Sequence, residues 1–426
     1  MMLRRIDQDE AMRRGRRDPI DADAVADAAR IVASVRERGE AAVREQAERF
    51  GERSAAEPLV LGRKAMDGAL RLLDARTCGV LERTARRIES FARDQRNSIR
   101  NMDVAIEGGR AGHTLVPIVA AGCYAPAGLH PLPSSVLMGT IPARVAGCDR
   151  VVVASPGAST IMLAAAAIAG ADEFLAVGGA HAIAALAYGF ERFEPVDMIA
   201  GPGNAWVTAA KHLVSPHVGL DMLAGPSELL VIADETAPAD LIAADLLAQA
   251  EHDPRASAML VTTRAALADA VDALLAVQLP ELDTHDVAAR VIANGFACVV
   301  GSIDAALRVA DAIAAEHVEV MTRDADAIAA QLRHAGAVFI GPGSAEVYGD
   351  YGAGPNHTLP TGGGARCGAG LSVFTFLRAR TWLRMDELPM EEPAAVRDDA
   401  MALAEIEGLD GHRRAALLRG SQAAGP

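Results

Sequence analysis

Polar side chains that could carry chemistry gather in four short stretches of the sequence. Gln249 and His252 lie three residues apart near the end of a predicted helix that begins at Pro238, so both project from one face. A histidine there could instead cap the helix, close to the negative end of its dipole. Glu316 and His317 set a carboxylate beside an imidazole between a predicted helix and a predicted strand. That pair could transfer protons, or it could form an ion pair at a helix end.

The other two stretches lie nearer the end of the chain. Asp350 and His357 flank a glycine-rich segment at 351–356, and Glu407 and His412 fall in the last helical region. An exposed loop or an exposed charge is the ordinary explanation of each. Together, Gln, His, Asp and His side chains make a plausible nitrogen and oxygen ligand set for zinc. No local spacing predicts such a site, so the residues alone leave its existence open.

Nucleotide-binding loops of the common kinds are absent from the sequence. No GxGxxG follows a predicted strand, and no GxxxxGK[ST] occurs anywhere in the chain. The segment Gly201-Pro202-Gly203-Asn204 follows a predicted strand and offers backbone amides to an anion or a nucleotide. A structural turn explains this segment equally well.

The elements that must position these residues follow an alternating pattern. The first hundred residues predict helices at 22–37, 40–50, 63–74 and 78–95, and strands then alternate with Ala-rich helices. The predicted strands are 150–154, 173–177, 198–200, 229–232, 258–262, 298–300, 318–321 and 338–340. Two such series, separated by the Gly- and Pro-rich region 201–226, predict an α/β fold with two doubly wound Rossmann-like domains. Because open α/β sheets bind ligands at the carboxyl ends of their strands, polar residues after strands are the first candidates for a site.

Composition narrows the class of protein. A chain of 426 residues is too long for one core, and its net charge of −15 argues against nucleic acid or an anionic membrane as partner. The five cysteines are far apart and form no CxxC pair, so neither a disulfide framework nor a thiolate zinc site is indicated. The sequence predicts no signal peptide, and its most apolar stretch, 161–171, is too short to span a bilayer. We expect a cytoplasmic enzyme.

Several long motifs in a fixed order resemble the histidinol dehydrogenase family. The resemblance covers nearly the whole chain and is carried by the segments Asp197–Val207 (DMIAGPGNAWV), Leu223–Asp234 (LAGPSELLVIAD), Asp245–Asp253 (DLLAQAEHD), Ala315–Glu319 (AEHVE), Tyr348–Pro360 (YGDYGAGPNHTLP) and Glu407–His412 (EGLDGH). We divide the chain into a helical N-terminal extension at 1–18, a catalytic α/β domain with the metal site at 19–122 and 229–370, an NAD-side domain at 123–228, and a helical tail at 371–426.

The resemblance implies a site and an activity. One zinc would be held by Gln249, His252, Asp350 and His412, and these ligands with Ser227, His317, His357 and Glu407 would contact the substrate. His317 would remove the hydroxyl proton as hydride leaves for NAD, and Glu316 would activate the water that hydrates the aldehyde. Tyr124, Asn204 and the position of His181 would contact NAD. The tail would cross to the other subunit of a homodimer, and the reaction would turn an amino alcohol, histidinol, into the acid histidine with two NAD, as a step of histidine biosynthesis.

Two departures fall on the NAD side. The family's Tyr-x-Pro-Gly-Gly segment reads Tyr124-Ala-Pro-Ala-Gly128 here, followed by Leu129-His130-Pro131, and His181 stands where Gln is usual. These changes admit a paralogue that oxidises another small polar alcohol, such as a sulfopropanediol. Glu407 favours an ammonium substrate, because its carboxylate would repel a sulfonate. A zinc hydrolase with Glu316 as general base and a catalytically silent metal-binding protein are the alternatives from other classes.

Overall fold

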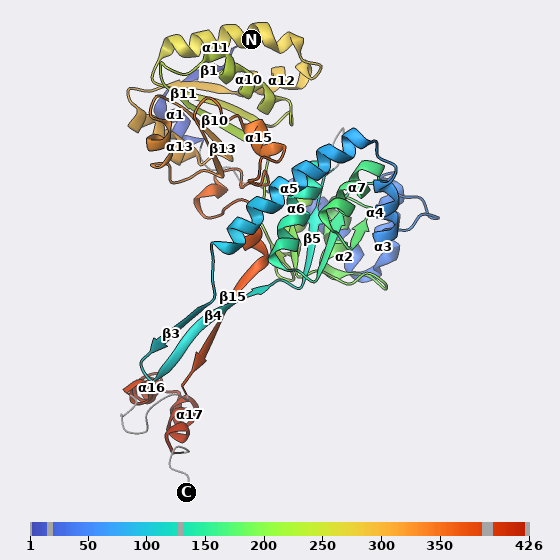
Figure 1. Ribbon diagram of the computed structural model, residues 1–426, viewed down its shortest axis with the longest axis vertical. Coiled ribbons are helices and arrows are strands. Elements are labelled where there is room, and N and C mark those ends of the chain that lie inside the picture. Colours follow the sequence, from blue (N-terminus) through green and yellow to red (C-terminus); the bar gives the residue numbers. More distant parts are fainter. Residues whose placement is uncertain (1, 15–19, 127–130, 386–394, 422–426) are drawn as a thin grey trace. The chain divides into compact units, whose positions relative to one another are not determined.

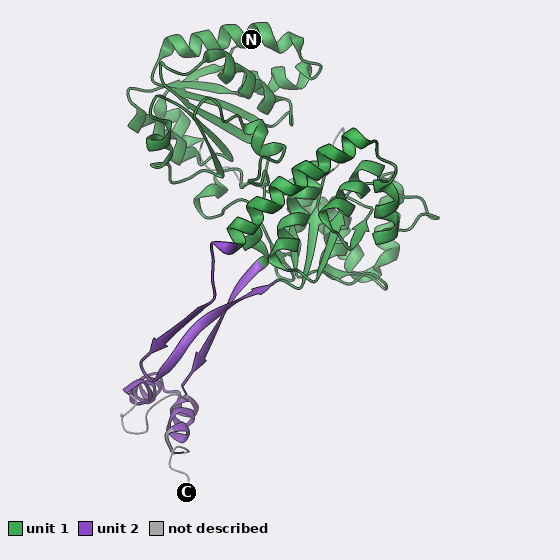
Figure 2. Cartoon of the chain, viewed as in Figure 1, with its two compact units in different colours: residues 1–96, 118–376 green, residues 97–117, 377–426 purple. Residues whose placement is uncertain are grey.

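The computed structural model describes residues 2–14, 20–126, 131–385 and 395–421 and divides into two compact units. The first unit comprises residues 1–96 and 118–376, and the second comprises residues 97–117 and 377–426 (Figure 2). The first unit contains two six-stranded sheets, and the second contains a three-stranded sheet with a pair of helices.

The first sheet is parallel throughout and has the strand order β1-β12-β11-β10-β13-β14 (Figure 1). Its central strand β10 (Glu228–Ala233) is buried on both faces. Leu229 and Val231 pack with helices on one face, and Leu230 and Ile232 pack with helices on the other, as the alternation of side chains along a strand requires. The other strands are β1 (Arg4–Ile6), β11 (Ser257–Thr262), β12 (Phe296–Val299), β13 (His317–Met321) and β14 (Ala337–Ile340).

Helices cover both faces of the first sheet. One face carries α10 (Ala239–Ala250), α11 (Ala265–Gln278) and α12 (His285–Asn294), and the other carries α1 (Gln8–Arg13), α13 (Ile303–Ile313) and α14 (Ala325–Ala329). The short elements η1 (Leu279–Glu281), α15 (Glu346–Asp350), η2 (Gly364–Arg366) and η3 (Val373–Phe376) complete this part of the chain. Strand β1 pairs with β12 and α1 packs on α13, so residues 4–13 belong to this sheet rather than to a separate helical extension.

The second sheet has the order β2-β7-β6-β5-β8-β9 and is parallel except for the pairing of β2 with β7. Its strands are β2 (Val60–Gly62), β5 (Ala120–Tyr124), β6 (Arg150–Ala154), β7 (Glu173–Leu175), β8 (Met198–Ala200) and β9 (Gly219–Leu220). One face carries α2 (Ala22–Arg38), α3 (Glu40–Arg49), α8 (Gly179–Tyr188) and α9 (Ala205–Val214), and the other carries α4 (Arg63–Leu70), α5 (Ala75–Asn97), α6 (Pro133–Ala146) and α7 (Thr160–Ala169).

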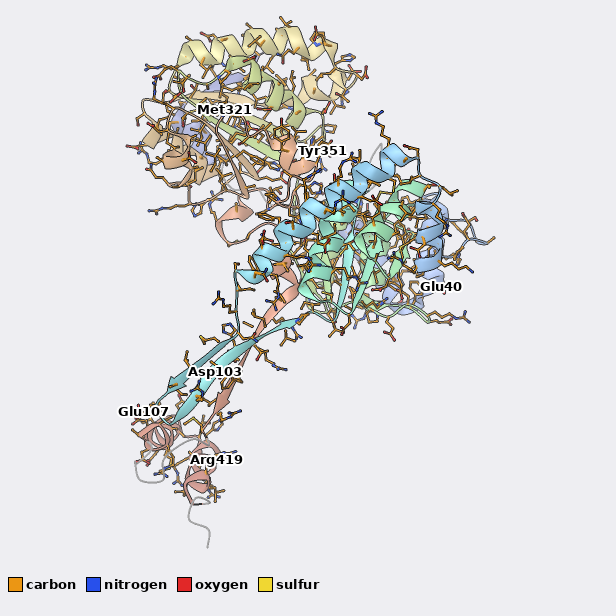
Figure 3. The ribbon with its side chains drawn as sticks, in the orientation of Figure 1. Glu40, Asp103, Glu107, Met321, Tyr351 and Arg419 are labelled. Atoms are coloured by element: carbon orange, nitrogen blue, oxygen red, sulfur yellow. The ribbon has the colours of Figure 1, made fainter. Side chains whose placement is uncertain are left out.

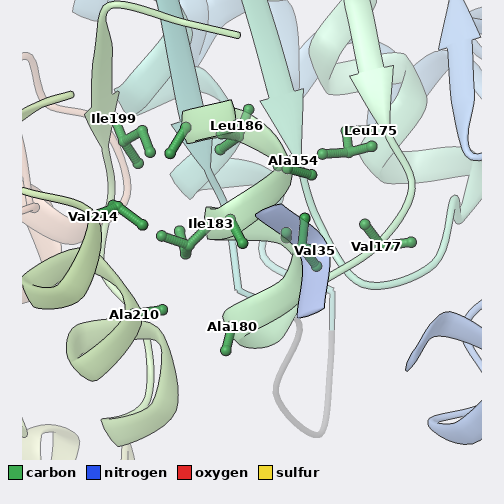
Figure 4. Close-up of a cluster of buried hydrophobic side chains, with 14 of the residues drawn as sticks. Val35, Ala154, Leu175, Val177, Ala180, Ile183, Leu186, Ile199, Ala210 and Val214 are labelled. Atoms are coloured by element: carbon green, nitrogen blue, oxygen red, sulfur yellow. The ribbon is translucent and has the colours of Figure 1, made fainter. Parts of the chain in front are cut away.

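Small side chains let these helices lie close to the second sheet. Figure 4 shows Val35 of α2, Ala180 of α8 and Ala210 of α9 in one buried cluster with residues of the sheet. Helices α2 to α5 therefore pack on the second sheet, whereas residues 19–122 were predicted to belong to the domain of the first sheet. The periodicity of a helix reveals that it has a buried face but not which sheet covers that face.

The second unit is built on an antiparallel sheet of order β15-β4-β3, followed by the helices α16 (Ala395–Ile406) and α17 (Asp410–Ser421). Its strands are β3 (Met102–Ile106), β4 (Gly109–Pro117) and β15 (Leu377–Arg384). Asp103 in β3 and Arg419 in α17 both belong to this unit (Figure 3). The prediction of an entirely helical tail was therefore wrong for residues 377–384. Strand β15 escaped notice because no residue in it is buried, so no alternation of apolar and polar side chains marks it.

Both large sheets repeat one strand order. Without the edge strands β1 and β2, the two orders are β12-β11-β10-β13-β14 and β7-β6-β5-β8-β9. If the strands of each sheet are numbered along the chain, both orders are 3-2-1-4-5, which is the order of a Rossmann fold. The two predicted series of alternating strands and helices are these two sheets. Within the described ranges, no helix is long and apolar enough to cross a membrane.

Candidate functional site

Glu316 and His317 lie at the amino end of β13, where His317 is the first residue of the strand. The His317 Nδ1 is 3.2 Å from the backbone oxygen of Glu228. A carbonyl oxygen can only accept, so Nδ1 carries the proton and Nε2 keeps its lone pair. Burial lowers the pKa of His317, because the charged imidazolium is poorly solvated there. His317 is therefore a neutral base at physiological pH.

Glu316 is held beside it by two hydrogen bonds. Its Oε2 accepts from the Ser227 hydroxyl at 2.5 Å and from the backbone N–H of Glu228 at 3.0 Å. Burial raises the pKa of Glu316 to about 7 although both hydrogen bonds oppose that rise. A carboxyl that titrates near neutrality can act as a general base or a general acid.

A group of possible metal ligands adjoins this pair. His252 Nε2 lies 3.6 Å from Asp350 Oδ2, and ligand atoms of His252, Glu346 and Asp350 all lie within 4.8 Å of one another. Gln249 is fully buried near the end of α10, and neither atom of its amide has a hydrogen-bond partner among the described residues. A buried polar group without a hydrogen bond is costly, so the amide of Gln249 is suited to coordinate a metal ion. This donor set of nitrogens and oxygens suits zinc.

His357 adjoins the metal group from the segment after α15. Its Nδ1 lies 2.9 Å from the backbone oxygen of Asp350, and its Nε2 lies 3.4 Å from the Ser135 hydroxyl of α6. Tyr351, next to Asp350, lies in the same segment (Figure 3). The first unit thus brings together Ser227, His252, Glu316, His317, Asp350 and His357. Glu407 and His412 are exposed residues of the second unit, in the segment after α16 and in α17.

A cleft of about 1170 Å³ leads from this site along the carboxyl ends of the second sheet's strands. Ser227 and His252 line one part of it, and all three predicted nucleotide contacts, Tyr124, His181 and Asn204, line the rest. Tyr124 ends β5, and its hydroxyl oxygen accepts from the N–H of Gly179 at 3.1 Å. Burial raises the pKa of Tyr124 to about 12, so the hydroxyl stays protonated.

The segment Gly201–Asn204 forms the cleft wall between β8 and α9. Gly201 has φ +119°, and a Cβ at this residue would lie 2.0 Å from the backbone oxygen of Tyr124, so only glycine fits. Asn204 caps α9, with its side-chain oxygen accepting from the N–H of Val207 at 3.1 Å. In space, the loop lies at the carboxyl ends of the neighbouring strands β5 and β8, where the strand order reverses. This is the place at which such sheets bind nucleotides.

Two buried acids, Glu346 and Glu319, and the half-buried Asp245 lie behind the site, and none of them was predicted as a site residue from the sequence. Glu346 Oε1 is 3.4 Å from His317 Nδ1, and the N–H of Glu346 donates to Glu319 Oε1 at 3.0 Å. Burial raises the pKa of Glu319 to about 8 and that of Asp245 to about 6. Glu319 could have been found as the one acid inside the apolar strand HVEVM. Glu346 could have been found as the acid one helical turn before Asp350.

Comparison with known proteins decides the family. A family model described as histidinol dehydrogenase matches residues 14–420. The chain belongs to the histidinol dehydrogenase family. Histidinol dehydrogenase of Rhodopseudomonas palustris is 44% identical over 399 residues, which are 92% of this chain and 91% of that protein. Histidinol dehydrogenase of Geobacillus kaustophilus is 43% identical over 395 residues, covering 91% of this chain and 92% of that protein.

A solved structure of the family has the same fold. The crystal structure of histidinol dehydrogenase from Elizabethkingia anophelis superposes with a TM-score of 0.91 at 28% identity, covering 99% of both chains. The predicted fold class is thereby confirmed. As a member of the histidinol dehydrogenase family the protein is an NAD-dependent oxidoreductase, as the sequence predicts. Family membership favours a dehydrogenase over the zinc hydrolase and the silent metal-binding protein.

Of the two departures from the family pattern, the structure describes His181 but not the altered residues of the Tyr124–Gly128 segment. Residues 127–130, which contain the altered part of the Tyr124–Gly128 segment together with Leu129 and His130, lie outside the described residues. His181 is described and almost fully buried, and its Nε2 lies 2.8 Å from Glu52 Oε2. The histidine that stands in place of the usual glutamine thus has a carboxylate partner in the nucleotide cleft.

Proposed function

We propose that this protein oxidises L-histidinol through an aldehyde to L-histidine, with one NAD for each oxidation, as a step of histidine biosynthesis. The observation that carries the proposal is the pairing of two bases with different environments at the amino end of β13. His317 has a lowered pKa and a free Nε2, whereas the pKa of Glu316 is raised to about 7. Two proton acceptors of different strength suit a reaction with two oxidation steps.

His317 would take a proton in the first oxidation. With Nδ1 donating to the Glu228 oxygen, the imidazole is held in one tautomer and Nε2 faces the side of Asp350, 3.9 Å from its Oδ1. From there Nε2 would remove the hydroxyl proton as hydride leaves the carbon for NAD. The carboxylate of Asp350 would stabilise the imidazolium that forms.

Glu316 would act in the second step. Its carboxylate, fixed by the Ser227 hydroxyl and the N–H of Glu228, would take a proton from the water that hydrates the aldehyde. The hydrated aldehyde is again an alcohol, so the second hydride transfer can use the same arrangement around His317. Retention of the aldehyde in a buried site would keep it from reacting elsewhere.

Gln249, His252 and Asp350 would hold a zinc ion, with His412 of the partner subunit as the fourth ligand. The unpaired amide of Gln249 and the approach of His252 to Asp350 support this ligand set. When bound, zinc would coordinate the imidazole and amino nitrogens of the substrate and so orient it. Glu407 of the partner subunit would pair with the ammonium group, and His357 would line the substrate pocket.

The composition of the second unit supports a homodimer with shared sites. Among the described residues of α16, α17 and the turn between them, only Ala404 is buried, whereas Leu403, Ile406, Leu409, Leu417 and Leu418 are exposed. Ile406 is 81% exposed. An exposed apolar surface of this kind marks a contact with another chain. A second copy of the chain would cover it and receive Glu407 and His412 at its own site.

The test is a screen for NADH formation with the zinc-loaded protein. Histidinol and histidinal should both be oxidised, a chelator should abolish turnover, and added zinc should restore it. Glu407→Gln should raise the KM for histidinol strongly, since an ammonium partner is lost. A sulfonated propanediol oxidised faster than histidinol, with Glu407→Gln neutral or beneficial, would identify the paralogue instead. Full activity in a protein shown by elemental analysis to lack metal would overturn the zinc assignment.

A further inference from the structure

The nucleotide cleft contains a buried acid–histidine pair that the proposed reaction does not use. Glu52 Oε2 lies 2.8 Å from His181 Nε2, and the Glu52 carboxylate also accepts from the N–H of Gly178 at 3.1 and 3.2 Å. The side chain of His181 is 1% exposed and that of Glu52 is 12% exposed. The carboxylate is therefore fixed by the protein and still reachable from the cleft, which it lines.

The order of the strands shows which half of a dinucleotide would meet this pair. Hydride transfer requires the nicotinamide to lie near Ser227 and His252, and α9 adjoins that end, since the Thr208 hydroxyl donates to the backbone oxygen of Ala224 at 2.8 Å. From α9 the second sheet continues from β8 through β5 and β6 to β7. Gly178 follows β7, so Glu52 lies at the end of the cleft away from the chemistry. The adenosine half of the nucleotide belongs there.

The surroundings of Glu52 fit an adenosine. The ring of Phe50 is 57% exposed, lines the cleft and stacks on His181 with ring centres 5.9 Å apart and an angle of 9° between the planes. An exposed flat ring can stack with a purine base. A carboxylate two residues further along can accept hydrogen bonds from the hydroxyls of the ribose. It does so in many dinucleotide sites.

The amides that could bind a phosphate at this end are already used. The N–H of Gly178 donates to Glu52, and the N–H of Gly179 donates to the Tyr124 hydroxyl at 3.1 Å, so the start of α8 is capped by side chains. Arg30 and Arg49 also line this part of the cleft, but Arg30 forms an ion pair with Asp27, and the guanidinium of Arg49 lies over Phe50, 5.4 Å from its ring centre. At the start of α8 a phosphate group would therefore meet the carboxylate of Glu52 and no free backbone amide of Gly178 or Gly179.

We propose that Glu52 makes this cleft select NAD over NADP: its carboxylate accepts the hydroxyls of the adenosine ribose and repels a 2′-phosphate. His181 is a positioning residue that holds the carboxylate in place, which gives a role to the histidine found where the family has glutamine. The assignment rests on the NAD dependence of the proposed function and concerns only which nucleotide the cleft accepts.

The experiment measures binding rather than turnover. The dissociation constants of NAD and NADP are determined by calorimetry and by quenching of Trp206, which lines the cleft. We expect NADP to bind roughly 100-fold more weakly than NAD, since juxtaposed like charges are strongly unfavourable. Glu52→Gln keeps the shape of the side chain and should reduce that ratio to roughly tenfold or less, mainly through tighter NADP binding.

Three controls make the result specific. Glu48→Gln makes the same charge change on the exposed surface of α3 outside the cleft, and it should leave the ratio unchanged. His181→Phe keeps a ring against Phe50 but cannot hold Glu52. The ratio of the NADP and NAD dissociation constants should therefore fall to a value between those of the unaltered protein and Glu52→Gln. ADP-ribose and its 2′-phosphate, which both lack nicotinamide, should differ as NAD and NADP do. Melting curves confirm that each variant is folded.

Equal binding of NAD and NADP by the unaltered protein, or an unchanged ratio in Glu52→Gln, would overturn the assignment. So would discrimination between the dinucleotides that is absent for the two ADP-ribose probes. An unchanged ratio in His181→Phe would remove His181 from the proposal. A protein that shows the expected selectivity but does not oxidise histidinol would contradict the proposed reaction and not the role of Glu52.

Discussion

The two large sheets of the first unit share one strand order and use opposite ends of it. In the second sheet, the cleft is lined by residues that end β5 or follow β6, β7 and β8, at the carboxyl ends of the strands. In the first sheet, Ser227 comes directly before β10 and His317 opens β13, so the chemistry lies at the amino ends. The usual rule for open α/β sheets places ligands at the carboxyl ends of strands, so it predicts the position of the nucleotide cleft and not that of Ser227 and His317.

Helix dipoles explain why both ends are useful. In an alternating α/β unit each helix runs antiparallel to its strands, so helix N-termini face the carboxyl ends of strands and helix C-termini face the amino ends. Helix α9 begins at the cleft, and its positive end suits the phosphates of a nucleotide. Helices α10 and α13 end close to the proposed metal ligands and to Glu316, where negative ends suit a metal ion or an ammonium group.

The largest expected effect tests whether the first sheet's site is complete within one chain. His317→Ala chains and His412→Ala chains should each be inactive alone, because each lacks a residue that every site needs. Mixed under conditions that exchange subunits, they should recover about a quarter of normal activity, since half of random dimers are mixed and each has one intact site. Mass spectrometry confirms the exchange. No recovery after confirmed exchange would mean that the tail serves its own chain.

The strand rule applies to the second sheet's cleft and not to the first sheet's site. The loop Gly201–Asn204 follows a strand and could be expected from that rule, whereas Glu316 and His317 precede a strand, were singled out only as a carboxylate beside an imidazole, and were given their roles by the family resemblance. Strands and helices could be read from periodicity. The packing of α2 to α5 on the second sheet could not, and neither could β15, whose side chains are all at least partly exposed.

Partners distant in sequence were also beyond prediction. Glu52 and His181 are separated by 129 residues, and nothing local to either residue points to the other. The same holds for Ser227 and Glu316, which are separated by 89 residues. Such pairs follow from the way strands are ordered in a sheet, and that order is a property of the whole fold.

The next largest effect separates the two bases of the first sheet. Glu316→Gln should slow the oxidation of histidinal more than the first hydride transfer from histidinol, because only the second step needs activated water. His317→Asn should impair both steps. Loss of a general base typically costs about 10²–10⁴ in rate. The measurement is single-turnover NADH formation from each substrate. Small and equal losses in both steps for both variants would contradict the assigned roles.

A smaller effect should appear in the pH dependence of stability of the metal-free protein. The pKa of Glu319 is raised from about 4.5 to about 8, so the folded chain keeps a proton that the unfolded chain releases. Its contribution to stability is therefore present below about pH 4.5 and lost as the pH rises towards about 8. Glu319→Gln cannot titrate and should gain on the unaltered protein by up to about 4 kcal/mol between about pH 5 and about pH 8, at about 1.4 kcal/mol for each pH unit. Urea midpoints that run parallel for the two proteins would contradict this.

The smallest effect concerns the second sheet and should leave the first untouched. A Cβ on Gly203 would lie 2.3 Å from Val207 Cγ1, and the β-branched valine cannot turn away without leaving α9. Gly203→Ala should therefore shift the loop and weaken a hydrogen bond to the nucleotide, which is worth about 1 kcal/mol or slightly more. We expect a roughly tenfold rise in the dissociation constant of NAD with little change in the binding of histidinol. Gly62→Ala is the matched control, because a Cβ there meets nothing within 4 Å. If Gly203→Ala weakened both ligands equally, the two sheets would not be separable, and the division of nucleotide binding and chemistry between opposite strand ends would have to be abandoned.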